Sequence, residues 1–99
     1  MDRFFREVYN LLRDIPSDLG YKLHLSRDYY FAVVSFLYVV YPGRGLKVKV
    51  KLLQIQIYVG LSTSGENELK YLVPQLDRSY CGWEEALNDV ALKVRSDVR

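Results

Sequence analysis

The sequence predicts an α+β fold in which an antiparallel sheet, built on a long β-hairpin, packs against an N-terminal and a C-terminal helix. Apolar residues recur at helical spacing near both ends of the 99-residue chain. The middle instead holds two runs rich in β-branched and aromatic residues, joined by a Gly/Pro segment. The hydrophobic share of 49% and the nine tyrosines argue against disorder, and the length suits one domain, residues 1–99.

The first helix is expected from Asp2 to Asp14, with Asp2 as its N-cap. Pro16 disfavours helical geometry at the residue before it and ends the helix. A short strand should follow from Tyr21 to Ser26, where apolar and polar residues alternate. The helical stripe consists of Phe4, Phe5, Val8, Leu11, Leu12 and Ile15.

The hairpin is expected to join a strand over Tyr29 to Tyr41 to a strand over Leu46 to Val59, through the loop Pro42 to Gly45. The apolar alternation of the second strand changes phase after Leu52, which predicts a β-bulge between Leu52 and Leu53. With that bulge, the polar residues would share one face: Lys47, Lys49, Lys51, Gln54, Gln56 and Tyr58.

The C-terminal third is expected to add a short strand, Glu68 to Val73, and a helix from Gly82 to Ser96. Trp83 begins the apolar stripe of that helix. The predicted core comprises Phe5, Val8, Leu12, Val33, Leu37, Val48, Val50, Ile55, Leu87 and Val90.

Both faces of the strand at Tyr29 to Tyr41 are apolar, which is unusual for a half-buried strand. If both helices cover one face, the other is an exposed apolar patch of the kind that marks an interface. If one helix covers each face, the strand is simply central, and the sequence favours neither arrangement. The predicted interface consists of Tyr30, Val34, Phe36 and Tyr38, with a second copy of the chain as the partner.

The hairpin is also basic. The chain has a net charge of +2, yet residues 29–60 hold four basic residues and no acidic one. Such a strand could contact a phosphate backbone while tyrosines stack on bases, with DNA or RNA as the partner. The simpler interpretation is that exposed lysines maintain solubility and prevent edge-to-edge pairing. The residues concerned are Arg44, Lys47, Lys49 and Lys51.

No residues have the spacing that catalysis or metal binding requires. Cys81 is the only cysteine and His24 the only histidine, so we expect a buried structural cysteine and a surface histidine on a strand. The acid-x-lysine sequence at Glu68 to Lys70 is typical of solvated charges more often than of a nuclease site. The sequence therefore predicts no enzyme activity, no catalytic residue, no metal and no cofactor.

The sequence also predicts an intracellular protein. The charged, amphipathic N-terminus does not resemble a signal peptide. The longest mainly apolar run, Tyr29 to Gly43, is shorter than the ~20 residues of a membrane-spanning helix.

Aromatic runs such as Tyr29-Tyr30-Phe31 and Tyr38-Val39-Val40-Tyr41 combine with a single cysteine and a single methionine. This composition resembles that of small orphan proteins from filamentous and rod-shaped viruses that infect hyperthermophilic crenarchaea. The resemblance covers the whole chain in composition but includes no motif, so it assigns no functional residue. It implies an unusual fold, stability to heat and acid, and a location in the host cytoplasm.

Two functions remain after these exclusions. The favoured one is a stable, non-enzymatic interaction module that associates with itself. The alternative is a nucleic-acid-binding protein that uses the basic hairpin, residues 44–51.

Overall fold

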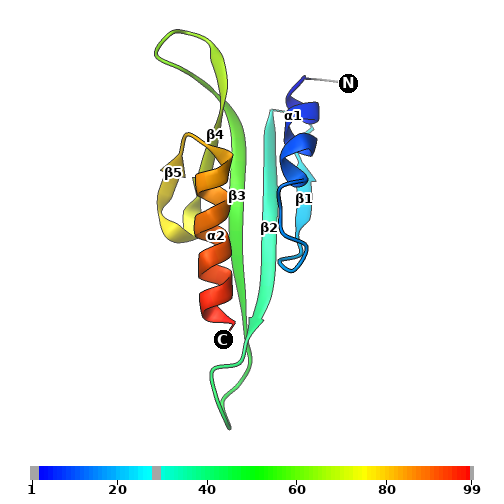
Figure 1. The fold of residues 1–99 in the computed structure, drawn as a ribbon, viewed down its shortest axis with the longest axis vertical. Helices are drawn as coiled ribbons and strands as arrows, with labels where there is room; N and C mark the ends of the chain where they lie inside the picture. Colours follow the sequence, from blue (N-terminus) through cyan, green and yellow to red (C-terminus); the bar gives the residue numbers. More distant parts are fainter. Residues whose placement is uncertain (1–2, 28–29, 99) are drawn as a thin grey trace.

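The computed structural model describes residues 3–27 and 30–98; Asp2, the expected N-cap, and Tyr29, the expected start of a strand, lie outside them. Within the described residues the chain forms two α-helices and five strands (Figure 1). A 3₁₀ turn, η1 (Pro74–Leu76), links the last two strands. In chain order the other elements are α1 (Arg3–Leu12), β1 (Lys22–Leu25), β2 (Phe31–Val40), β3 (Lys49–Leu61), β4 (Asn67–Val73), β5 (Arg78–Tyr80) and α2 (Trp83–Asp97).

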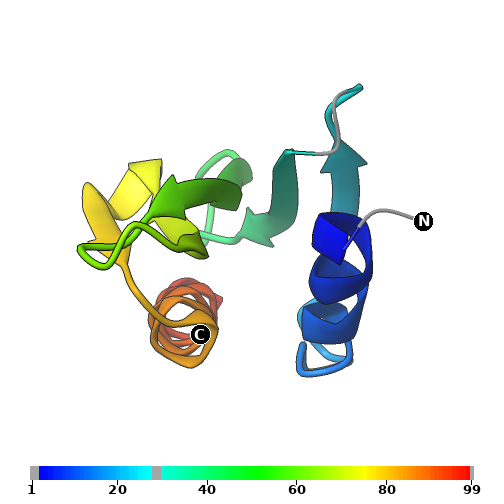
Figure 2. The ribbon, with the colours of Figure 1, turned by 90° about the horizontal axis from the view of Figure 1, so that it is seen from above.

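The five strands form one sheet in the order β1-β2-β3-β4-β5, and each strand is antiparallel to its neighbours. Both helices lie on the same face of this sheet, with α1 below β1 and α2 below the other half (Figure 2). The predicted α+β class, with an antiparallel sheet and two terminal helices, is therefore confirmed. The opposite face of the sheet carries no element from the described part of the chain. We call it the open face.

Helix α2 supplies much of the core because one side of it is apolar along its whole length. Glu84 and Glu85 lie in its first turn and Arg95 in its last turn, the order that the helix dipole favours. Helix α1 contributes Phe4 and Val8, which are buried. The buried residues of α2 are Trp83, Ala86, Leu87, Val90, Ala91 and Val94.

The sheet meets the helices through alternate residues of β2 and β3. Ala32, Val34 and Phe36 of β2 lie directly opposite residues of β3 on this face. These three residues and their β3 partners are each at most 3% exposed, so this layer is closed to solvent. Their partners are Ile57, Ile55 and Leu53, respectively.

The predicted β-bulge is wrong. Every residue of β2 pairs with a residue of β3 in one continuous register, with no displaced residue near Leu52. Lys49 and Lys51 therefore lie on the same face as Ile55 and Ile57. The lysines tolerate that face because the sheet extends to the end of α2 there, where their side chains reach solvent.

The missing bulge also changes the core. Val8, Ile55, Leu87 and Val90 are buried as predicted, whereas Phe5, Leu12 and Val33 are half-buried. The other three predicted core residues lie on or beyond the open face and are largely exposed, with exposed fractions of 66%, 51% and 62% for Leu37, Val48 and Val50.

The molecule is elongated, measuring 54 × 27 × 21 Å. Its radius of gyration is 15.0 Å, whereas a compact domain of this length has about 13 Å. The turn between β3 and β4 projects at one end, and the hairpin of β2 and β3 extends past the other strands at the opposite end (Figure 1). Its connecting loop, residues 41–48, is exposed throughout and longer than the four residues expected.

We predict that Trp83→Ala lowers the free energy of unfolding by ~3–5 kcal/mol, because it leaves a cavity where α2 begins. Trp83 is 5% exposed, and its ring centroid lies 5.9 Å from that of Tyr71. Trp83→Phe should cost less, since a ring remains and the indole Nε1 has no acceptor among the described residues. Urea unfolding followed by circular dichroism measures both. Equal losses for Ala and Phe would contradict the packing argument.

Candidate interaction surface

The hairpin of β2 and β3 has a distal part in which each strand has only one neighbour among the strands of the described residues. β1 pairs with β2 only as far as Ser35, and β4 pairs with β3 only from Gln56 onward. Residues 36–40 and 49–53 therefore pair with each other alone. We call these two segments and their connecting loop, residues 36–53, the arm.

The open face of the arm is apolar. Two directly opposed cross-strand pairs lie there, Leu37 with Leu52 and Val39 with Val50. Their exposed fractions are 66%, 41%, 40% and 62% in that order. Isolated exposed apolar residues are common on protein surfaces, but a contiguous group is not. We call these four residues the arm patch.

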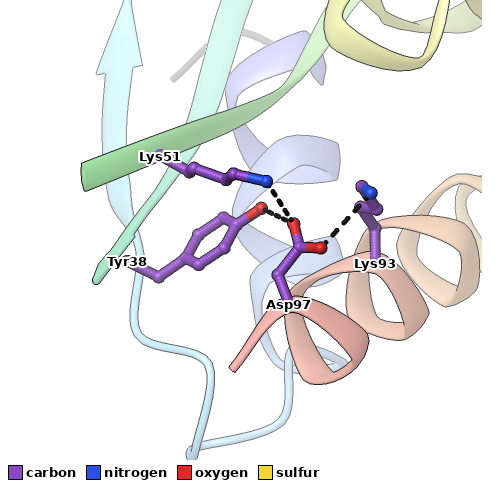
Figure 3. Close-up of polar contacts among 4 residues, drawn as sticks. All are labelled: Tyr38, Lys51, Lys93 and Asp97. Atoms are coloured by element: carbon purple, nitrogen blue, oxygen red, sulfur yellow. Dashed lines mark hydrogen bonds and ion pairs between the residues drawn. The ribbon is translucent and has the colours of Figure 1, made fainter. Parts of the chain in front are cut away.

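The other face of the arm carries a polar cluster that holds it to the end of α2 (Figure 3). The Tyr38 hydroxyl donates a hydrogen bond of 2.8 Å to the Asp97 carboxylate. Lys51 Nζ lies 3.4 Å from the same carboxylate, and Lys93 Nζ lies 3.3 Å from its other oxygen. This Asp97 cluster joins the arm to the last turn of α2.

The contacts of the Asp97 cluster shift the ionisation of both acidic groups. The hydrogen bond from Tyr38, with the nearby Lys93 and Lys51, lowers the pKa of Asp97 below its usual range. Burial, followed by the hydrogen bond to the Asp97 carboxylate, raises the pKa of Tyr38 to about 12. The hydrogen-bonded pair of neutral phenol and charged carboxylate is thus the stable form at neutral pH.

The backbone of the arm offers two unpaired edges. The N–H of Gln54 points away from β2, where it donates a 2.9 Å bond to the Gln75 side chain. Because edge direction alternates along a strand, the backbone groups of Val50 and Leu52 point the same way. On β2, the Phe31 carbonyl accepts a bond from Ser26 on the β1 side, so Leu37 and Val39 direct their backbone groups to that outer edge.

The predicted interface residues lie mostly on the covered face. Val34 and Phe36 are 0% and 1% exposed, so the helices already occupy the face that was expected to bind a partner. Tyr38 is half-buried in the Asp97 cluster, and only Tyr30 is well exposed. Since both faces of β2 are apolar, the strand's own residues do not distinguish the open face from the covered one.

The predicted basic residues do not share the polar face assigned to them. Arg44 and Lys47 lie in the exposed loop of the arm, and Lys49 and Lys51 lie on the helix side of β3. Lys51 is also paired with Asp97. The four residues follow one segment of chain, but one charge is already partly neutralised.

The other candidate residues singled out in the sequence lie outside the arm. Cys81 is exposed, which corrects the expected buried cysteine, whereas His24 is exposed on β1 as predicted. Glu68 forms an ion pair with Lys70. In residues 3–27 and 30–98, no three His, Cys, Asp or Glu side chains gather closely enough to hold a metal ion.

A small hollow of about 150 Å³ lies between α1 and the β3–β4 pair. Arg3, Glu7 and Glu68 contribute its charged groups, and Tyr30 lines one side. Arg3 pairs with Glu7 at 3.0 Å, and Glu68 is held by Lys70. Its carboxylates are thus engaged in ion pairs, so the arm is the stronger candidate for a functional surface.

Comparison of the chain with protein-family models, with curated proteins and with solved structures gives no match. Among the helices of the described residues, none is long and apolar enough to cross a membrane.

We expect Tyr38→Phe to lower the free energy of unfolding by ~1–2 kcal/mol at neutral pH, because it removes a hydrogen bond to a charged group. The stabilisation by the Asp97 carboxylate should be complete above the ordinary pKa of 3.8 and disappear as the pH falls through the lower folded value. The stability advantage of the wild type over Asp97→Asn should shrink accordingly. Unfolding curves between pH 2 and pH 7 measure this difference, and parallel curves for the two proteins would refute it.

Proposed function

We propose that this protein is a non-enzymatic interaction module that associates with itself through the arm. The observation that carries the proposal is the arm patch, two cross-strand pairs of Leu and Val exposed on the open face. An apolar surface of this kind gains free energy, about 25 cal/mol for each Å² removed from water, when a partner covers it.

A second copy is the partner that the patch suits best. In a two-fold symmetric dimer, the same surface is contributed by both copies and must be compatible with itself. The arm patch meets this requirement because its four side chains are uncharged and of similar size. The lysines of the arm's strands point to the opposite face, so the patches can approach without bringing like charges together.

The charge pattern supports nucleic-acid binding less strongly. Lys51 is paired with Asp97, and Lys49 lies on the helix side of β3. Gln54 and Gln56 lie on the open face, so the lysines and glutamines do not form one continuous polar surface. A phosphate-binding strand would need several unpaired cations along one track. The lysines agree better with protection of the β3 edge against pairing.

The first test is the mass of the protein in solution. We expect light scattering to give twice the mass of one chain for the wild type and the mass of one chain for Leu37→Lys, because a buried charge at the patch is costly. Leu92→Lys is the matched control, since Leu92 is also 66% exposed but lies on α2. It should remain dimeric. A monomeric wild type at high concentration, or a dimeric Leu37→Lys, would overturn the proposal.

The alternative is tested by the dependence of binding on salt. If the arm contacts phosphates, replacing Lys47, Lys49 and Lys51 by glutamine should flatten the slope of log affinity against log salt by roughly two to three units. We expect instead that the wild type shows no salt-dependent affinity for DNA or RNA at low salt. Fluorescence anisotropy with labelled oligonucleotides measures both quantities, and a steep slope that the triple variant loses would establish the alternative.

A further inference from the structure

The arm has two free backbone edges, and they differ in chemistry. We infer, on the basis of the proposed self-association, that two copies pair through the outer edge of β2, antiparallel about a two-fold axis at Tyr38. In this register Leu37 of one copy lies opposite Val39 of the other. The sheets of the two copies then form one continuous sheet. The two arm patches lie side by side on its open face, where the Leu37 side chain of each copy packs against Val39 of the other.

The outer edge of β3 is protected against such pairing. Lys49 and Lys51 flank the edge-facing Val50, and lysine is a residue that natural edge strands use to prevent association. Gln75 also occupies the edge at Gln54, with hydrogen bonds of 2.9 Å to its backbone N–H and 3.4 Å to its side chain. Antiparallel pairing of two β3 edges would place lysines of the two copies about 5 Å apart.

The outer edge of β2 has none of these protections. Its free segment, Phe36 to Val40, contains no charged residue, no proline and no bulge. An uncharged, apolar edge without a bulge is the type that accepts another strand. The free segment begins where the pairing with β1 ends, at Ser35. It is five residues long.

The length of this segment allows it to pair with the same segment of a second copy. Pairing about Tyr38 uses residues 36–40 of both copies, so the second strand fills the space beyond β1 without displacing it. Leu37 and Val39 are the residues whose backbone groups face this edge. In the proposed register they form two hydrogen-bonded pairs, Leu37 with Val39 and Val39 with Leu37, which provide four backbone hydrogen bonds.

Charge repulsion is small in this arrangement. Neighbouring strands are about 4.8 Å apart, so the β3 strands of the two copies would be separated by roughly 14 Å across the paired β2 strands. This separation exceeds the screening length of about 8 Å at physiological ionic strength. The lysines that oppose pairing of the β3 edges therefore permit pairing of the β2 edges.

Proline substitution tests which edge is used. The Val39 N–H faces the outer edge of β2, where in the proposed dimer it bonds to the second copy. Val39→Pro removes this N–H, and the proline ring blocks the approach of a strand. The dimer dissociation constant should therefore rise roughly 100-fold. Val50→Pro is the matched control, because its N–H faces the outer edge of β3. It should change the dissociation constant by less than about threefold. Sedimentation equilibrium gives both constants, and circular dichroism checks folding.

A cysteine pair tests the register without relying on proline. In a Cys81→Ser background, which removes the exposed native thiol, Tyr38→Cys would place two cysteines opposite each other with Cα atoms about 4.5 Å apart. Oxidised glutathione should link them in a disulfide-bonded dimer. Val40→Cys is the control, since four residues of offset place its two copies about 13 Å apart. It should remain unlinked.

The outcomes separate this inference from the function on which it rests. Dissociation by Leu37→Lys, with Val39→Pro still dimeric and no crosslink at position 38, would preserve self-association and overturn the β2 edge. Equal dissociation by both proline variants, or equal crosslinking at positions 38 and 40, would also overturn it. A wild type that is monomeric at all concentrations removes both proposals. If Val39→Pro does not fold, crosslinking at position 38 and not at 40 decides in favour of the β2 edge.

Discussion

The uninterrupted register between β2 and β3 is the constraint on which the other features depend. Because the pairing contains no extra residue, side chains alternate strictly along both strands. Ile55 and Ile57 must face the helices, and Val50 and Leu52 must then face away from them. Lys49 and Lys51, which alternate with Val50 and Leu52, consequently lie on the helix side, where Lys51 reaches the carboxylate of Asp97. A single displaced residue at Leu52 would reverse the β3 half of the arm and place Lys49 and Lys51 on the open face beside Leu37 and Val39. The apolar patch and the Asp97 cluster are thus two results of one register.

The fold class followed from the sequence because its signals are local. Helical spacing at Phe4 and Val8, and again from Trp83 to Val94, indicated both helices, and the apolar stripes are the buried sides. The strand β5, by contrast, has three residues, which is too short for alternation to be recognised. The bulge was wrong for a different reason. The phase change at Leu52 assumed that apolar residues in a strand avoid solvent, but Leu37 and Val50 lie on the open face, which no helix of the described residues covers.

The sequence predicted the type of the candidate surface, an exposed apolar face, but not the residues that form it. An exposed apolar face on the hairpin was expected, but Val34 and Phe36 belong to the covered face, and Leu37 and Val39 to the open one. The helices pack on the covered face together with contacts between residues distant in sequence, such as Arg95 with Asp18 at 3.3 Å and Tyr38 with Asp97. Neither contact has a signature in a short window of sequence.

The order of strands in the sheet has a kinetic consequence. Each strand pairs with the strand next to it in the chain, so the sheet can grow by adding one hairpin at a time. Domains dominated by contacts between nearby residues fold faster than domains of similar size with distant pairings. The slow step should then be the docking of α2, since its ties to Asp18 and Tyr38 close loops of 77 and 59 residues. Until that helix docks, the inner side of the sheet stays exposed to water together with the arm patch. During synthesis the hairpin therefore exposes Val34 and Phe36 on one side and the arm patch on the other before its C-terminal cover exists.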